Sequence, residues 1–314
     1  MAIVAAGWLL AWFTPSVKCF AQTGERNFFE PLVTQDPNPS NELDIEPAWT
    51  AIRGGQDVSV LFSLEKQLSA NISIELEDDW NAPLCPDQSA CEGASPLRRG
   101  RSRSRNRRLA RGIPLENGFG NLQLLGKFAF FASDRHEARV AIGLNISLPT
   151  GNPNALASTH TYYGPMLMVA KGMGDLPDGP LWRYLRPFAL QADAYYMIKA
   201  GGTQGDDLGA DVAISWQPYY LPVQPRNGIE RELLRLTPFA EFSYDQLIVT
   251  SRGGTQPDLL VLPGVAYVGN SFQLSLATQV PMNTATVHLA HASVVAMLSL
   301  TLDRIWSGFG WTLF

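Results

Sequence analysis

Apolar and polar residues alternate along most of the chain. The clearest case is the segment 139–148 (RVAIGLNISL), where every second residue from Val140 onward is a large aliphatic one. The segment 271–281 (SFQLSLATQVP) repeats the arrangement. Successive side chains of an extended strand point to opposite faces, so a period of two is the signature of a strand with one apolar and one polar face. The pattern predicts β-strands.

About twelve segments of this kind follow one another, and each is roughly 10 to 15 residues long, whereas strands of soluble proteins average about 5 to 6. A strand tilted in a bilayer needs about 9 to 11 residues to cross it. We therefore predict an all-β fold, an antiparallel transmembrane up-and-down β-barrel of about 12 strands. The expected strands are 42–52, 56–66, 69–79, 119–132, 136–148, 160–171, 183–197, 208–220, 232–246, 258–268, 271–281 and 292–305.

The connections between these segments alternate in length. If both chain ends are periplasmic, odd-numbered connections face the exterior and tend to be long, and even-numbered ones tend to be short. The even connections at 66–69, 133–136 and 269–271 are tight, and the odd ones at 80–118 and 149–159 are long. Exceptions are the even connections 172–182 and 221–231 and the short first odd one. The alternation, although imperfect, favours a barrel.

A soluble barrel and a membrane barrel share this alternation and differ in which face is hidden. Aromatic residues near the segment ends, such as Trp49, Trp80, Tyr163, Trp182 and Tyr195, resemble the interfacial girdles of membrane barrels. The alternative is that they are ordinary core aromatics. Strand length, aromatic placement and an export signal together favour the membrane barrel.

The N-terminus has the pattern of an export signal. Residues 2–13 (AIVAAGWLLAWF) form an apolar run of signal-peptide length, and cleavage after Ala21 is reasonable, although no Lys or Arg precedes the run. The alternative is a buried N-terminal helix. We predict a signal peptide at 1–21, a flexible periplasmic leader at 22–41 and the barrel at 42–314. This organisation implies the outer membrane of a Gram-negative bacterium.

Three phrases point to a known family: NISLPTGNP (145–153), LTPFAEFSYD (236–245) and LPGVAYVGNSFQLSLATQVPMN (262–283). In their order and spacing they resemble the bacterial outer-membrane β-barrels of the meta-pathway phenol-degradation family, and the likeness covers most of residues 42–305. The chain departs from the family in an arginine-rich insertion and in the tail WSGFGWTLF. The resemblance implies a transporter-like channel or uptake barrel rather than a phenol-cleaving enzyme.

Composition narrows the class of protein further. Only 17% of the residues are charged, 46% are hydrophobic, and the formal net charge is −5. A soluble domain has roughly 25% charged residues, and a disordered chain has fewer apolar ones. The mean hydropathy of −0.04 excludes a bundle of transmembrane helices.

The long connection 80–118 carries two chemical features. Cys85 and Cys91 are the cysteines left after signal cleavage, and their short spacing in an exported chain predicts a disulfide-closed loop. A metal site is the weaker interpretation, because two thiols do not complete a tetrahedral ligand set. The second feature is a basic cluster without acids: Arg98, Arg99, Arg101, Arg103, Arg105, Arg107, Arg108 and Arg111.

This basic cluster has two interpretations. It is either a solvated loop or an exterior loop that binds lipopolysaccharide phosphates or another acidic polymer. Nucleic acid is disfavoured as a partner because no aromatic residues interleave with the arginines. Outer-membrane lipid and a small solute of unknown identity are the other expected partners.

Motifs for catalysis and cofactors are missing from the sequence. GNLQLLGKF (120–128) has the wrong spacing for a phosphate loop and ends on Phe128 where Ser or Thr would bind Mg²⁺. His288 and His291 are three residues apart, which places them on opposite faces of a strand and disfavours a metal site. We expect a protein that is not an enzyme and binds no cofactor and no metal.

If the apolar face meets lipid, the opposite face lines the lumen. Because unpaired charge in a dry core is costly, this face should be wet or cross-paired, and its excess of acids predicts a modest preference for cations. Asp44 belongs to the same face. The pore-lining candidates are Glu46, Glu75, Glu77, Lys127, Arg139, Asn145, Gln191, Asp193, Asp211, Gln217, Arg235, Glu241, Gln273 and Asp303.

Two functions fit these observations. The first is a channel or uptake porin for small solutes, apolar or aromatic ones among them. The second is a non-conducting structural or surface-interaction barrel whose basic loop binds an anionic partner.

Overall fold

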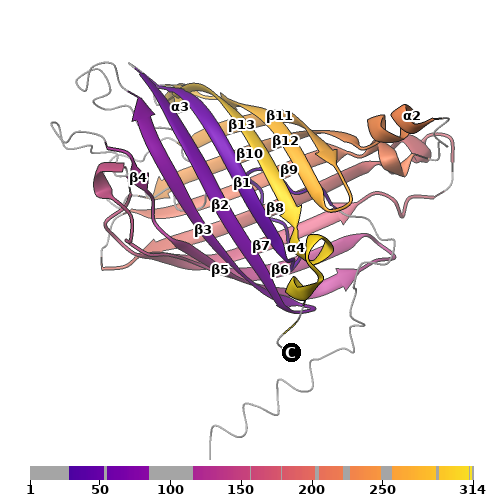
Figure 1. Cartoon of the computed structure of the whole chain (residues 1–314), viewed down its shortest axis with the longest axis horizontal. Helices are drawn as coiled ribbons and strands as arrows, with labels where there is room; N and C mark the ends of the chain where they lie inside the picture. The colour runs from indigo at the N-terminus through magenta and orange to yellow at the C-terminus, as the bar shows by residue number, and fades with distance from the viewer. Residues whose placement is uncertain are drawn as a thin grey trace, which may run out of the picture.

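The computed structural model describes residues 28–52, 55–84, 116–155, 157–177, 179–201, 205–221, 227–248, 257–287, 290–310 and 312. One antiparallel sheet contains every strand of these residues (Figure 1). It closes on itself because β2 (Gly55–Ser69) pairs with β1 (Glu42–Ile52) on one side and with β3 (Ile72–Leu84) on the other, while β1 also pairs with the last strand, β13 (Ala290–Thr301). The prediction of an all-β, up-and-down barrel is confirmed. It has twelve long strands and one short extra strand, β4, beside β3.

The strands occupy the segments that the alternation predicts. Their bounds are β1 (Glu42–Ile52), β2 (Gly55–Ser69), β3 (Ile72–Leu84), β4 (Gly118–Phe119), β5 (Gln123–Ser133), β6 (Ala138–Ser147), β7 (Tyr162–Gly172), β8 (Phe188–Lys199), β9 (Asp206–Trp216), β10 (Leu236–Ile248), β11 (Asp258–Val268), β12 (Phe272–Pro281) and β13 (Ala290–Thr301).

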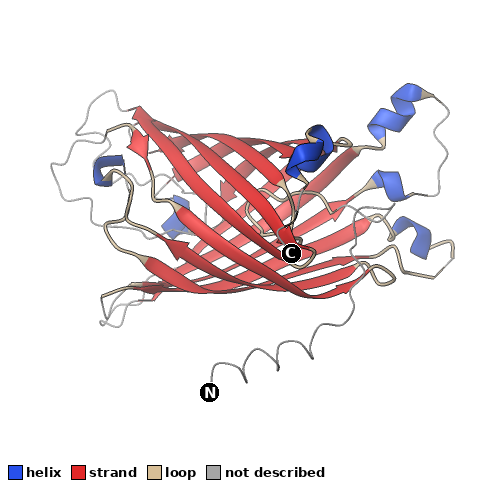
Figure 2. Ribbon diagram, turned by 60° about the horizontal axis from the view of Figure 1, so that its bottom comes forward, coloured by secondary structure: helices blue, strands red, loops and turns tan. Residues whose placement is uncertain are grey.

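Short helices lie at the two ends of the barrel (Figure 2). At the end that holds the tight turns β2–β3, β5–β6 and β11–β12, the longer connections contain η3 (Trp182–Tyr184), η4 (Pro218–Tyr220) and α2 (Gly228–Leu233). The chain leaves β13 at this same end through α4 (Leu302–Ile305) and η5 (Ser307–Phe309). The opposite end carries η2 (Pro153–Ala155) and α3 (Thr284–Val287). None of the described helices is long and apolar enough to cross a membrane.

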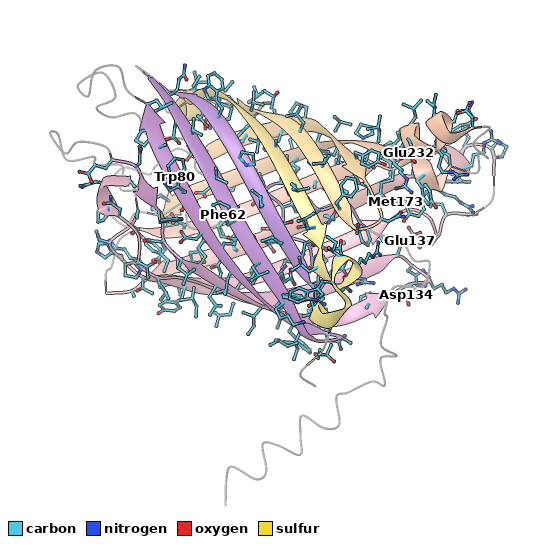
Figure 3. The ribbon with its side chains drawn as sticks, viewed as in Figure 1. Phe62, Trp80, Asp134, Glu137, Met173 and Glu232 are labelled. Carbon is cyan, nitrogen blue, oxygen red and sulfur yellow. The ribbon has the colours of Figure 1, made fainter. Side chains whose placement is uncertain are left out.

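The barrel is apolar outside and polar inside. On β3, Ile72, Ile74 and Leu76 face outward while Ser73, Glu75 and Glu77 are buried. Side chains cover the outer surface of β2 and β3, where Phe62 of β2 and Trp80 of β3 are labelled (Figure 3). A barrel in water hides its apolar face, and a barrel in lipid exposes it. Other outward-facing apolar residues are Phe128, Ile142, Leu144, Leu167, Ile214, Phe242, Leu274, Leu276 and Val294.

Some predicted strand ends are wrong, for local reasons. Pro218 starts η4 and ends β9 earlier than expected. The predicted start of β10 belongs to α2, which begins because the Asn227 side chain accepts a hydrogen bond from the Glu230 amide. The predicted end of β13 turns into α4 after Thr301. Each error extended a strand into a helical connection.

Candidate functional site in the barrel lumen

Most of the predicted lining residues face the interior. They are buried in a closed barrel whose outer surface is apolar, so their polar side chains surround the lumen. That they line a conducting pore stays a prediction. The inward-facing set is Glu46, Glu75, Glu77, Lys127, Asn145, Gln191, Asp193, Asp211, Gln217, Glu241 and Gln273.

The remaining three lining candidates lie differently. Arg139 donates a hydrogen bond to the side-chain oxygen of Asn38 and therefore also points inward. Arg235 precedes β10, where it lies 3.7 Å from Glu232 of α2 and contacts Asn270, so it belongs to the rim and not to the lumen wall. Asp303 lies on α4, beyond the end of β13. The prediction that Arg235 and Asp303 line the lumen is wrong, because both fall in helical connections.

Residues 28–41 lie inside the barrel, although the sequence predicted a flexible periplasmic leader here. Phe29 and Leu32 belong to one apolar cluster with residues of β9 to β13. Thr34, Gln35 and Asp36 are buried as well. We call residues 28–41 the lumenal segment.

Glu241 of β10 holds the centre of the lumenal segment. Its carboxylate accepts hydrogen bonds from three successive backbone amides, those of Leu32 (2.7 Å), Val33 (2.8 Å) and Thr34 (3.0 Å). The Thr34 hydroxyl donates a fourth at 3.3 Å. Glu241 is fully buried, and hydrogen bonds to a carboxylate are stronger than those between neutral groups. This cluster fixes the segment against one side of the wall.

Other strands bind the segment on either side of Glu241. The Gln273 side chain of β12 accepts from the Glu30 amide (2.9 Å) and donates to the Glu30 carbonyl (2.7 Å). Asp193 of β8 accepts from the Gln35 amide at 2.6 Å. Glu65 of β2 accepts from the Ser40 amide at 3.0 Å. Because these partners lie on β2, β8, β10 and β12, the segment is attached to separate parts of the barrel wall.

The apolar side of the lumen receives the side chains of Phe29 and Leu32. The ring of Phe29 lies 4.9 Å from that of Phe239, centroid to centroid, and Phe29 is 1% exposed. Gly264 makes room for the Phe239 ring, since a Cβ added there would come within 2.4 Å of it. The rest of this pocket is formed by Ala213, Leu260, Leu262, Ala266, Ala277 and Met297.

The charged side of the lumen lies on β2, β3 and β5. Lys127 Nζ is 2.7 Å from Glu65 and 3.0 Å from Glu75, and all three side chains are buried. Asp36 of the lumenal segment faces this group. Burial raises the pKa of Asp36 to about 6, although the charges of Lys127 and Arg139 act to lower it. Burial and the nearby Glu42 likewise raise the pKa of Glu30.

A small cavity lies between the lumenal segment and the wall. The cavity beside residues 30–35 offers about 40 Å³ for the centres of water-sized molecules. One water needs about 10 to 15 Å³ by this measure, so the cavity holds a few waters and no larger solute. Its wall residues include Asp44, Glu46, Glu77 and Asp211. Beside residues 30–35 the lumenal segment therefore leaves only an acidic slit along the wall.

Several lumenal residues escaped the sequence analysis. Glu65 shares the polar face of β2 with Ser63, so the alternation could have found it. No periodic signal marks Phe29, Leu32 or Asp36, since their place depends on a segment folding back into the barrel. Tyr195, expected near an interface, faces inward and donates a hydrogen bond to Asp245.

The structure leaves several predictions untested, because the residues concerned are not among those it describes. Cys85, Cys91, the basic cluster Arg98–Arg111 and the signal peptide lie outside the described residues, as does His288. Among the described residues, no group of three or more His, Cys, Asp or Glu side chains has a geometry that could hold a metal ion.

Comparisons with known proteins find similar folds only. No family model matches the chain, and no curated protein matches it in sequence. The KdgM porin (10% identity, TM-score 0.42) and the NanC porin (10%, TM-score 0.49) each align over 82% of this chain and 98% of their own. The COG4313 outer membrane channel from Pseudomonas putida F1 (11%, TM-score 0.49) aligns over 87% and 99%. These similarities are too remote to indicate what this chain binds or conducts.

Proposed function

We propose that this chain is an outer-membrane channel for small solutes and that the lumenal segment closes it. The observation that carries the proposal is the inverted barrel: an apolar outer surface around a lumen lined by carboxylates, amides and Lys127. Lipid accommodates such an exterior, and a closed barrel satisfies every backbone hydrogen bond within it. Exported barrels of this type reside in the outer membrane, which is the location we propose.

The contacts of the lumenal segment support the proposal that it can leave the lumen. A permanently filled barrel needs only a packed core, whereas this segment is held mainly by hydrogen bonds to Glu241, Asp193, Gln273 and Glu65. Water can replace these bonds, because protein–water hydrogen bonds substitute for them; the net cost is about 0.5 to 1.5 kcal/mol for each neutral bond and about 1.5 to 3 kcal/mol for each bond to a carboxylate. The apolar contribution comes mainly from Phe29 and Leu32, and Val33 packs against the same cluster. The segment is therefore a removable closure.

A second candidate function is the non-conducting barrel, which the filled lumen itself favours. In that case the lumenal segment is a structural part of the interior, and the function lies on the outer surface or in the loops. Conductance separates the two functions directly.

The test is single-channel recording in planar bilayers with Phe29→Ala/Leu32→Ala. Removing both apolar anchors should raise the open fraction at least tenfold over the unmodified chain. Leu181→Ala is the matched control, because Leu181 is an equally apolar residue but lies 80% exposed outside the lumen. It should leave the open fraction unchanged. Silence of the folded double variant under all voltages would overturn the channel proposal and favour the structural barrel.

A further inference from the structure

The Glu241 carboxylate lies in apolar surroundings, and this combination defines a binding site. Its register partners across the sheet are Ala213 on β9 and Leu262 on β11. Phe239, two residues earlier on the same strand face, lines the same pocket. A fully buried carboxylate with such neighbours requires compensation by hydrogen-bond donors or positive charge.

Donors of this chain supply that compensation only while the lumenal segment is in place. Every hydrogen bond found on Glu241 among the described residues comes from residues 32–34. No lysine or arginine of the described part of the chain forms an ion pair with it; Lys127 instead pairs with Glu65 and Glu75. When the segment leaves, the carboxylate is exposed beside a pocket that Phe29 and Leu32 have vacated.

The chemistry of the vacated site selects one class of solute. A neutral aromatic compound fills the pocket but leaves the carboxylate without donors. An aromatic or aliphatic carboxylate brings a second negative charge and is repelled. An organic ammonium ion fills the pocket with its body, donates N–H groups to Glu241, and places its charge within reach of the Phe239 ring face.

We infer that Glu241 and the pocket around Phe239 bind small organic cations with an aromatic or branched aliphatic body, and that Phe29 and Leu32 occupy the same site in the closed state. The lumenal segment thus imitates the solute: its N–H groups take the place of the ammonium, and its side chains take the place of the body. This inference rests on the proposed channel function and names the solute class for it.

Binding is tested by calorimetry on the detergent-solubilised full chain carrying Phe29→Ala/Leu32→Ala. The probes are phenethylammonium, the neutral benzyl alcohol and the anion phenylacetate. We expect phenethylammonium to bind at least tenfold more tightly than the other two, and Glu241→Gln in the same background to abolish that preference. Equal binding of phenethylammonium and benzyl alcohol, tighter binding of phenylacetate, or no binding of any probe would overturn the inference.

A carboxylate elsewhere on the same strand provides the matched control. Asp245 lies four residues along β10 from Glu241, where it accepts a hydrogen bond from Tyr195 at 3.2 Å. Asp245→Asn in the Phe29→Ala/Leu32→Ala background should leave phenethylammonium affinity within twofold. A loss equal to that of Glu241→Gln would show that general lumenal charge attracts the cation, and the specific site would be refuted.

The unmodified chain gives a second test that needs no variant to fold. Phenethylammonium competes with the lumenal segment, so millimolar concentrations should raise the open fraction in planar bilayers, whereas phenylacetate should not. Conductance of the double variant without selective binding would refute this inference and leave the channel standing. Selective binding without conductance in any variant would refute the channel and, with it, the role of the cation as a transported solute.

Discussion

The two sides of the lumen neutralise their buried carboxylates in different ways. On the charged side, Glu65 and Glu75 are held by Lys127, a permanent part of the wall. On the apolar side, Glu241 is held by backbone amides of the lumenal segment. The first arrangement survives removal of the segment, and the second does not.

In the proposed channel, this difference separates the stability of the barrel from the opening of its lumen. Changes on the charged side should weaken the wall, because an uncompensated buried charge stays behind. Changes on the apolar side should mainly weaken the attachment of the lumenal segment and leave the strands of the wall in place. The following predictions test that separation, beginning with the largest effect.

Lys127→Met should destabilise the folded barrel more than a volume-conserving change on the apolar side. It leaves Glu65 and Glu75 facing each other without their cation, and loss of one partner of a buried ion pair costs about 3 to 5 kcal/mol. The measurement is urea unfolding followed by heat-modifiable mobility on gels. Leu262→Met is the control on the apolar side, and a volume-conserving exchange there should cost less than about 1.5 kcal/mol.

The triple variant Lys127→Met/Glu65→Gln/Glu75→Gln sharpens this prediction. It removes the two charges together with the lysine, so most of the lost stability should return. If the single and triple variants unfold at the same urea concentration, the ion pair contributes packing only, and the contrast between the two sides is wrong.

Acid should close the channel through Asp36. Its pKa rises to about 6 inside the barrel because of burial, with Lys127 and Arg139 opposing the rise and Glu65 adding to it. Glu30 and Glu42 also interact with this carboxyl. A raised pKa means that the closed state binds the proton more tightly than the open state, so closure gains stability as the pH falls through about 6 and loses it as the pH rises.

The open fraction should therefore fall severalfold between pH 7 and pH 5 in planar bilayers. Asp36→Asn should reduce that pH dependence and favour the closed state at pH 7, and Glu30, whose pKa is also raised by burial, should account for the rest. His136→Gln is the control, because this histidine lies outside the lumen at the β5–β6 turn, next to Asp175. An unchanged pH response in Asp36→Asn would assign the effect to Glu30 or Glu42 instead.

The alternation of residues was enough to predict the barrel and most of its inner surface. Period two fixes which residues share a face, so Glu75, Asp193 and Glu241 could be placed inward without a structure. It failed at Arg235 and Asp303, where a capping residue or a strand end redirects the chain. Such boundaries depend on single residues, as where the Asn227 side chain caps the N-terminus of α2.

The position of the lumenal segment could not be predicted from the sequence. Its polar, Pro- and Asn-rich composition is typical of a flexible linker, and its partners on β2, β8, β10 and β12 are far away along the chain. Only closure of the barrel brings these partners together around residues 28–41. The only available hint was a group of large apolar residues at the start of an otherwise polar stretch: Phe28, Phe29, Leu32 and Val33.

The smallest expected effect concerns ion selectivity of the opened lumen. Lys127 is the only basic residue among the described side chains that are fully buried in the wall, and many carboxylates surround it. Rings of acidic side chains favour cations, so Phe29→Ala/Leu32→Ala should show a modest cation preference in reversal-potential measurements under a salt gradient. Adding Glu46→Gln/Glu77→Gln should reduce it, because both carboxylates line the slit beside the lumenal segment. Asp175→Asn, at the rim, should leave the preference unchanged.

The cation preference should also shrink as salt rises from about 0.1 M to 1 M, where the screening length falls from about 10 Å to 3 Å. An anion preference would contradict the assigned lumen, or would mean that the basic cluster Arg98–Arg111 sets the charge at the mouth of the channel.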